Sequence, residues 1–147
     1  MPSADLHTAR RTLLDRSPVR RALVIDDEGA VRSVLRRWLK RRGWEVAEAP
    51  DGQVALAQLR DGGEPAKARD FDLIICDLRM PSLSGPELHA WARCHRPDLA
   101  QRLVFASGDV QEPEAAEFLQ QCGCPVLEKP FELSRLEAVL STFDPRV

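Results

Sequence analysis

The residues of this chain that are best suited to chemistry stand directly after short apolar runs. In chain order they are Asp26 and Asp27, Asp77, Ser107 and Lys129. Three carboxylates held close together repel one another and favour a hard divalent cation, and Mg²⁺ suits them because it takes oxygen ligands. An ammonium group and a hydroxyl beside that ion could hold a phosphoryl group. In the middle of such a pocket, Asp77 would be the natural nucleophile for phosphoryl transfer.

Each of these residues alone has a simpler structural explanation. An Asp after a strand is more often a turn or cap residue, so Asp26 and Asp27 could merely cap a helix. Lys129 is followed by Pro130 and could simply mark the end of a strand. The chemical interpretation therefore depends on whether the fold brings all of these positions together.

Strand patterns and helix patterns alternate five times along the chain. Short apolar runs at 22–25, 73–76, 103–106 and 125–128 predict strands, and so does the alternation of apolar and polar residues at 44–49. A helical spacing of apolar residues follows each of them, and Ser84 to Glu87 form a capping box. This alternation predicts an α/β fold with a doubly wound, five-stranded parallel sheet in the flavodoxin-like order 2-1-3-4-5. Strands one, three, four and five are then neighbours about 5 Å apart, and their carboxyl ends meet at one edge.

Each predicted helix is expected to bury one face. The residues on these faces are Val31, Val34, Leu35, Trp38 and Leu39; Val54, Ala55, Leu56 and Leu59; Leu88, Trp91, Ala92 and His95; Ala115, Phe118, Leu119 and Cys122; and Leu133, Leu136, Val139 and Leu140. The basic residues of the first helix are expected to form a solvated face. Cys76 and Cys94 are expected in the core. Cys122 and Cys124 are interpreted as structural thiols rather than a metal pair, because no second Cys or His pair lies nearby in the sequence.

The composition excludes several functional classes. A net charge of −2 gives no bulk electrostatic reason to expect nucleic acid or an anionic membrane as a partner. The apolar runs are too short to cross a bilayer, and residues 1–18 lack the apolar centre of a signal peptide. We therefore expect a cytoplasmic protein with reduced cysteines. Residues 1–18 are predicted to form a flexible tail or an accessory helix, and residues 19–147 a single domain.

Taken together, the motifs resemble the receiver domain of two-component response regulators, the class that includes the chemotaxis response regulators. The matching segments are ALVIDDE at 22–28, FDLIICDLRMPSLSG at 71–85, LVFASGD at 103–109 and PVLEKPF at 125–131, and the likeness covers residues 20–142. The resemblance implies that Asp77 accepts a phosphoryl group from a histidine kinase or a histidine phosphotransfer protein. It implies that Mg²⁺ is bound by Asp27, Asp77 and the backbone carbonyl of Arg79, with Asp26 contributing through water. Lys129 would pair with the phosphate, and Ser107 would be the switch hydroxyl.

The resemblance also assigns roles to residues around the site. Arg79 and Asp109 lie two residues beyond Asp77 and Ser107, and in this family such positions flank the path of the attacking water. Receivers usually carry Tyr or Phe three residues before the lysine, whereas this chain carries Val126. The usual coupling between the switch hydroxyl and that ring therefore cannot operate in the same form. An output partner is expected on the face made by helix 112–122, strand 124–128 and helix 132–142.

Several functional alternatives stay open at this point. A receiver of this kind could stand alone, act as a phosphorelay intermediate or be part of a hybrid histidine kinase. A phosphohydrolase of the haloacid dehalogenase type uses similar residues, but its nucleophile follows strand one in a DxD pattern, and here the second residue after Asp26 is Glu28. A binding module with an idle pocket is the remaining alternative, and the complete set of residues argues against it. We expect a signalling domain rather than an enzyme.

Overall fold

The computed structural model describes residues 19–61, 71–108 and 110–143, so the predicted tail at 1–18 lies outside the described residues. The strands are β1 (Arg21–Ile25), β2 (Glu45–Ala49), β3 (Leu73–Asp77), β4 (Leu103–Ser107) and β5 (Val126–Glu128). The helices are α2 (Gly29–Lys40), α3 (Gly52–Asp61), α4 (Gly85–His95), α5 (Pro97–Ala100), α6 (Pro113–Cys122) and α7 (Leu133–Phe143). No helix within these ranges is long and apolar enough to cross a membrane.

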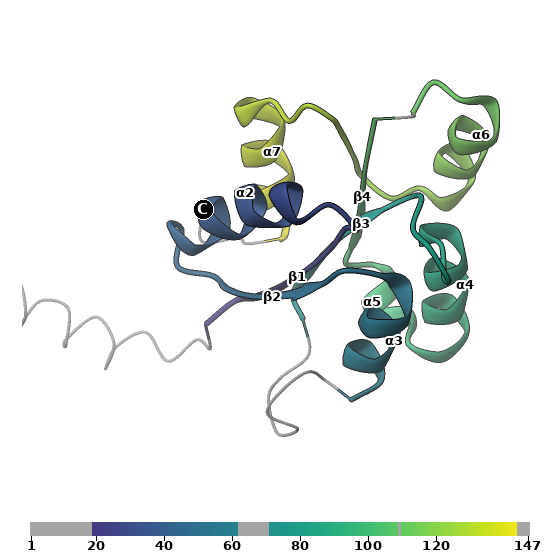
Figure 1. The fold of residues 1–147 in the computed structure, drawn as a ribbon, viewed down its shortest axis with the longest axis horizontal. Helices are drawn as coiled ribbons and strands as arrows, with labels where there is room; N and C mark the ends of the chain where they lie inside the picture. The colour runs from purple at the N-terminus through teal and green to yellow at the C-terminus, as the bar shows by residue number, and fades with distance from the viewer. Residues whose placement is uncertain (1–18, 62–70, 109, 144–147) are drawn as a thin grey trace, which may run out of the picture.

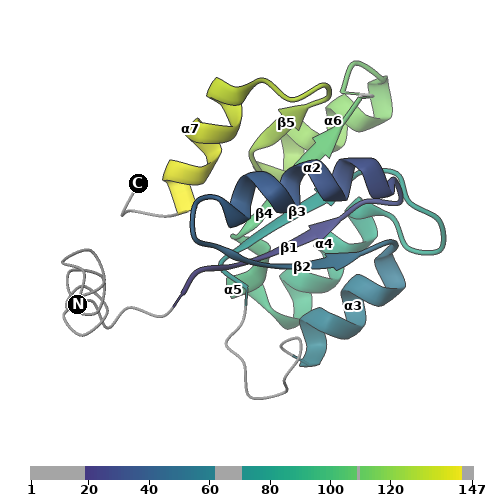
Figure 2. The same cartoon turned by 60° about the vertical axis from the view of Figure 1, so that its left-hand side comes forward.

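The strands form one parallel sheet in the order β2-β1-β3-β4-β5, which confirms the predicted topology. Helices α2 and α7 cover one face of the sheet, and α3, α4, α5 and α6 cover the other (Figures 1 and 2). All five residues of β1, of β3 and of β4 are buried, as expected of central strands covered on both sides.

Two apolar cores lie on opposite faces of the sheet. One joins α2 and α7 to alternate residues of the central strands, for example Val24 and Ile75. The other joins α3, α4 and α5 to the intervening residues, for example Ile74 and Phe105. Because successive strand side chains point to opposite faces, a continuous apolar run can supply both cores at once.

The helix ends follow local sequence signals. At the start of α4 the Ser84 hydroxyl accepts from the Glu87 amide, and the Glu87 carboxylate accepts from the Ser84 amide. The predicted capping box is therefore confirmed. At the end of α6, Gly123 adopts a left-handed conformation with φ 69°, which a residue with a Cβ rarely adopts.

Several burial predictions were wrong. Val34 is 51% exposed, because it lies about a third of a turn from the centre of the α2 face that buries Leu35 and Leu39. Val54 and Leu133 are also exposed, and they lie in the first turns of α3 and α7. On α4, the face centred on Leu88 and Ala92 turns His89 inward rather than His95.

The buried His89 packs edge-on against Phe105 and Phe118, with ring centroids 6.1 and 5.7 Å away. Burial and the nearby Arg93 lower the pKa of His89, so this imidazole is neutral at physiological pH. Cys76 is buried as predicted, whereas Cys94 is exposed and does not belong to the core. Pro97 stops α4 as expected and also begins the short helix α5, which the sequence pattern did not predict.

Candidate functional site

The parallel sheet delivers the predicted side chains to a single edge. In the β3–β4 register Asp77 lies opposite Ala106, so Ser107 stands one residue further along β4. The amide of Lys129 donates to the carbonyl of Ser107 over 3.0 Å, which joins the end of β5 to the end of β4. Asp26 follows β1 directly, and its amide donates to the Ala49 carbonyl at the end of β2. The arrangement at the carboxyl ends of the strands is thus the one the topology implies.

Three carboxylates gather at this edge. Asp26, Asp27 and Asp77 each offer one oxygen, and these oxygens all lie within 4.8 Å of one another. Asp26 and Asp77 are buried, with 2% and 8% of their surface exposed, while Asp27 lies at the exposed mouth. A donor set made only of carboxylate oxygens, open to water on one side, fits Mg²⁺, because that ion takes oxygen ligands and keeps part of its hydration shell.

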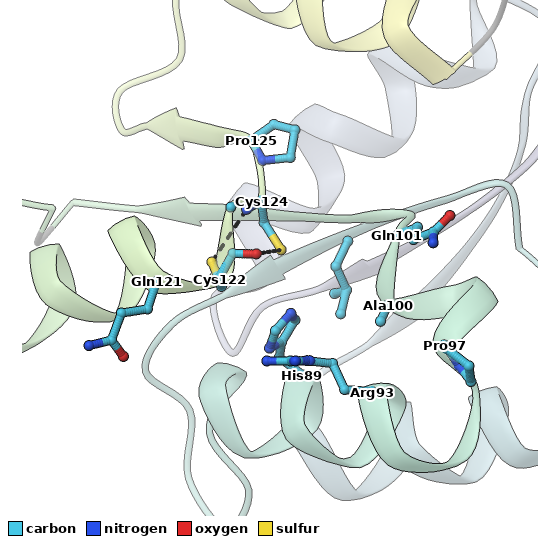
Figure 3. A pocket seen from close by; sticks show the side chains of 11 residues that line it. His89, Arg93, Pro97, Ala100, Gln101, Gln121, Cys122, Cys124 and Pro125 are labelled. Carbon is cyan, nitrogen blue, oxygen red and sulfur yellow. Dashed lines mark hydrogen bonds between the residues drawn. The ribbon is translucent and has the colours of Figure 1, made fainter.

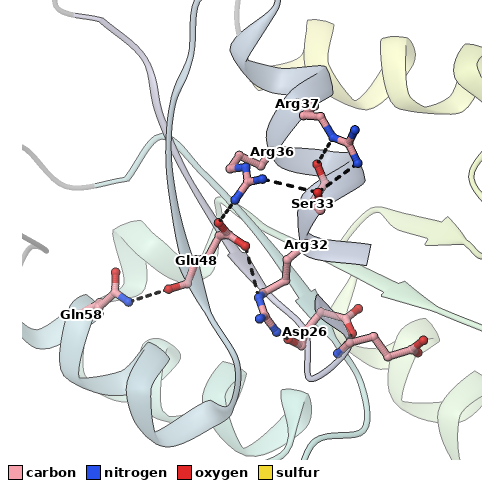
Figure 4. Close-up of polar contacts among 8 residues, drawn as sticks. Asp26, Arg32, Ser33, Arg36, Arg37, Glu48 and Gln58 are labelled. Carbon is pink, nitrogen blue, oxygen red and sulfur yellow. Dashed lines mark hydrogen bonds and ion pairs between the residues drawn. The ribbon is translucent and has the colours of Figure 1, made fainter. Parts of the chain in front are cut away.

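Asp26 is held by the loop and the helix that follow it. Its Oδ1 atom accepts a hydrogen bond from the Glu28 amide at 2.9 Å. Its backbone carbonyl accepts one from Arg32 Nη1 at 2.6 Å, and Arg32 also reaches Glu48 on β2 at 3.3 Å (Figure 4). Arg36 contacts the same Glu48 carboxylate at 2.8 Å. The basic face of α2 was expected to be solvated, but two of its arginines therefore bind groups at the end of β1 and on β2. Sequence reasoning missed Arg32, and its only signal was its position one turn into the helix after Asp26.

Lys129 closes the cluster from the β5 side. Its Nζ atom lies 2.8 Å from Asp26 Oδ2 and 3.5 Å from Asp77 Oδ2. Burial works against the charged ammonium, but the hydrogen bond from Lys129 to Asp26 and the charge of Asp77 outweigh it and raise the pKa of Lys129. Lys129 therefore stays protonated and is within reach of both buried carboxylates.

The surroundings of Asp77 disfavour its ionised form. Burial, followed by repulsion from Asp26, raises the pKa of Asp77 from 3.8 to about 6, although Lys129 pulls it down. Gly85 lies directly behind it, because a Cβ at that position would stand 2.6 Å from the Asp77 carbonyl oxygen. This glycine lets the start of α4 approach the end of β3 closely, a requirement the sequence analysis did not identify.

One ion pair links the loop after β3 to the segment that precedes α6. Arg79, on the loop after β3, forms an ion pair with Glu112 at the start of α6. Arg79 and Asp109 were predicted to flank the path of the water that attacks the phosphate. Asp109 lies outside the described residues. Glu112 was missed as a partner because it was interpreted only as the start of a helix.

A model of the response regulator receiver domain matches residues 22–141. The chain belongs to the receiver domain family.

Individual relatives of this receiver agree with that assignment. The sensor kinase CckA of Brucella abortus is 34% identical over 115 residues, which cover 78% of this chain and 11% of the kinase. A response regulator receiver protein from Pseudomonas putida has a TM-score of 0.72 at 27% identity, covering 86% of this chain and 98% of that one. TrrA from Thermotoga maritima, solved in complex with Mg²⁺-BeF, has a TM-score of 0.71 at 25% identity, with 85% and 99% covered. The receiver spans 11% of the length of CckA and 54% of the length of the transcriptional regulatory protein FixJ from Bradyrhizobium diazoefficiens, less than two thirds of either protein.

Val126, at the position where the family pattern has Tyr or Phe, borders a cavity in this receiver. Val126 on β5 is only partly buried, and it lines a cavity of about 680 Å³ together with Val110, Phe131 and Arg135. Lys129 lines the same cavity, so this space borders the carboxylate cluster. The cavity belongs to the face on which an output partner was predicted.

Proposed function

We propose that this receiver is a phosphoacceptor and that Asp77 is the residue phosphorylated. The observation that carries the proposal is the position of Asp77: it is buried, 3.5 Å from Lys129 Nζ and clustered with Asp26 and Asp27. An isolated structural Asp would not need two further carboxylates and a lysine around it, because like charges so close cost stability.

The donor in this proposal is a phosphohistidine on a histidine kinase or a histidine phosphotransfer protein. A carboxylate oxygen of Asp77 forms a new bond to phosphorus while the P–N bond to the donor imidazole breaks. The electron pair of that bond returns to the imidazole, which then takes up a proton from water. The product is an acyl phosphate on Asp77, and no other substrate is turned over.

The neighbouring side chains have distinct tasks in this scheme. Lys129, already held between Asp26 and Asp77, pairs with an oxygen of the transferred phosphoryl group. Ser107, at the end of the neighbouring strand, donates its hydroxyl to another oxygen. Mg²⁺ bound by Asp27, Asp77 and the Arg79 carbonyl, with Asp26 acting through water, would supply charge neutralisation. The all-oxygen donor cluster and the Mg²⁺-BeF complex of TrrA both support that ion.

Covalent labelling tests the proposal directly. Incubation with acetyl phosphate and Mg²⁺ should add one phosphate to the intact mass, and hydroxylamine should remove it, because an acyl phosphate is labile to that nucleophile. Asp77→Asn should not be labelled, whereas Asp98→Asn, at an exposed position on α5, should be labelled like the wild type. Labelling that persists in Asp77→Asn would refute the assignment. Continuous release of phosphate from simple esters, without a kinase, would instead favour the phosphohydrolase alternative.

The cellular setting belongs to the same proposal. We propose a cytoplasmic receiver whose output partner is a protein, bound through α6, β5 and α7. The relatives that match this domain include a sensor kinase and transcriptional regulatory proteins, so the domain could serve in a relay, in a hybrid kinase or with a separate output protein. Reconstitution with candidate donor proteins carrying ³²P-labelled phosphohistidine would separate these settings by the rate of transfer.

A further inference from the structure

A second cavity lies at the opposite end of β5 from Lys129. It has a volume of about 620 Å³ and is bordered by α4 on one side and by the connection from α6 to β5 on the other. Cys122 and Cys124 lie along that connection, and His89 and Arg93 of α4 face them across the cavity (Figure 3). The phosphoacceptor site uses none of these residues.

The turn between α6 and β5 holds the two cysteines close together. Gly123, with φ 69°, ends α6 and reverses the chain between them. The amide of Cys124 donates to Cys122 Sγ at 3.4 Å, and the thiol of Cys124 donates to the Cys122 carbonyl at 3.9 Å. Both side chains are half-buried at the cavity, unlike the fully buried Cys76 and the exposed, solitary Cys94. Two thiols thus lie on one short turn beside the same cavity.

We propose that Cys122 and Cys124, interpreted from the sequence as structural thiols, instead bind one monovalent soft cation, Cu(I), as a two-thiolate site. Sulfur ligands select Cu(I) over hard ions such as Mg²⁺ and Ca²⁺. A structural zinc site requires four ligands. Among the residues that the structure describes, the aspartate cluster is the only group of three or more acidic, His or Cys residues close enough to share an ion. The cysteine pair therefore fits an ion that accepts two ligands.

The charges and protons of this site balance. Each thiol loses one proton, two Cu–S bonds form and no electron is transferred, so the bound unit carries one negative charge. The guanidinium of Arg93 borders the same cavity and offsets that charge. Because thiolate ligands must lose their protons to bind a metal, binding releases two protons to solvent.

The experiment is done in the absence of oxygen. It measures the transfer of Cu(I) from its coloured complex with bathocuproine disulfonate to the reduced protein. The wild type should remove one Cu(I) per chain from the dye, as should Cys94→Ser, which lacks the solitary exposed thiol. Cys122→Ser with Cys124→Ser should lose this capacity while its thermal melting shows that it is folded. In the wild type, bound Cu(I) should also protect both cysteines, but not Cys94, from alkylation mapped by peptide mass.

Three results would overturn the inference. They are no transfer of Cu(I) to the wild type, equal transfer to the double variant, and alkylation of Cys122 and Cys124 that Cu(I) leaves unchanged. An intact mass lower by two hydrogens would show a disulfide instead of a metal site and would also overturn it. Because Asp77→Asn leaves this cavity untouched, that variant should still bind Cu(I), which keeps the test independent of the phosphoacceptor proposal.

Discussion

Replacing Asp77 with Asn should stabilise this receiver in the absence of Mg²⁺ at neutral pH. Asp77 is buried beside Asp26, and the fold raises its pKa from 3.8 to about 6. Above pH 6 the native state must therefore hold an ionised carboxylate in a place that favours the neutral form. Asn has nearly the same shape as the protonated acid and does not carry the charge.

The magnitude follows from the same pKa. A rise from 3.8 to about 6 corresponds to about 3 kcal/mol, at about 1.4 kcal/mol for each unit of pKa. The site opens to water at the exposed Asp27, and solvent screening reduces this cost to about 1–2 kcal/mol. For a chain of 147 residues, that free energy corresponds to a melting temperature about 3–8 °C higher in Asp77→Asn.

The sign of the pH dependence is opposite to that of an acid in a salt bridge. Because the folded pKa is raised, the contribution of Asp77 to stability is fully present below pH 3.8 and is lost as the pH rises through about 6. The advantage of Asp77→Asn over the wild type should therefore be absent near pH 4 and complete above pH 7.

Thermal melting in EDTA from pH 4 to pH 8 measures this difference, and adding Mg²⁺ provides a second comparison. An ion that binds only the native state stabilises the wild type by mass action, and Asp77→Asn should gain much less. Asp98→Asn is a useful control, because the hydrogen bond to Arg96 lowers the pKa of Asp98 and removing that charge should not stabilise the protein. The reasoning is refuted if Asp77→Asn melts no higher than the wild type at pH 7.5 in EDTA, or if the gain is equally large near pH 4.

Three further predictions concern the metal, the lifetime of the phosphate and the output. Asp27→Ala should weaken Mg²⁺ binding and slow labelling by acetyl phosphate while the fold persists, since Asp27 is exposed; an unchanged affinity in calorimetric titration would contradict its role. Arg79→Ala and Glu112→Gln should each speed loss of phosphate severalfold, because their ion pair ties the loop that follows Asp77 to the start of α6 and so restricts the access of water. Glu114→Gln, in the first turn of α6, should not have this effect, and equal decay in all three variants would argue against shielding. Ser107→Ala should uncouple phosphorylation from partner binding, and Val126→Ala should affect little beyond stability. Phosphorylation should change amide exchange across residues 107–130, and changes confined to α2 would contradict this account.

Local sequence patterns are sufficient to specify the topology of this receiver and the residues that make up its site. Alternating strand and helix patterns specify a parallel sheet, and right-handed connections leave the order 2-1-3-4-5 as the natural one. Since parallel strands share the direction of their carboxyl ends, the residues after each apolar run had to meet at one edge. The sequence alone therefore predicts that Asp26, Asp77 and Lys129 lie close together.

Tertiary structure decided which contacts each side chain makes. The helical period predicts a buried face but not its centre, so Val34 and Cys94 are exposed while His89 is buried. The pairing of Arg79 with Glu112 joins two loops that no local pattern relates. Long-range pairs of this kind depend on the relative positions of elements that pack through apolar contacts, and a single sequence carries no signal for those positions.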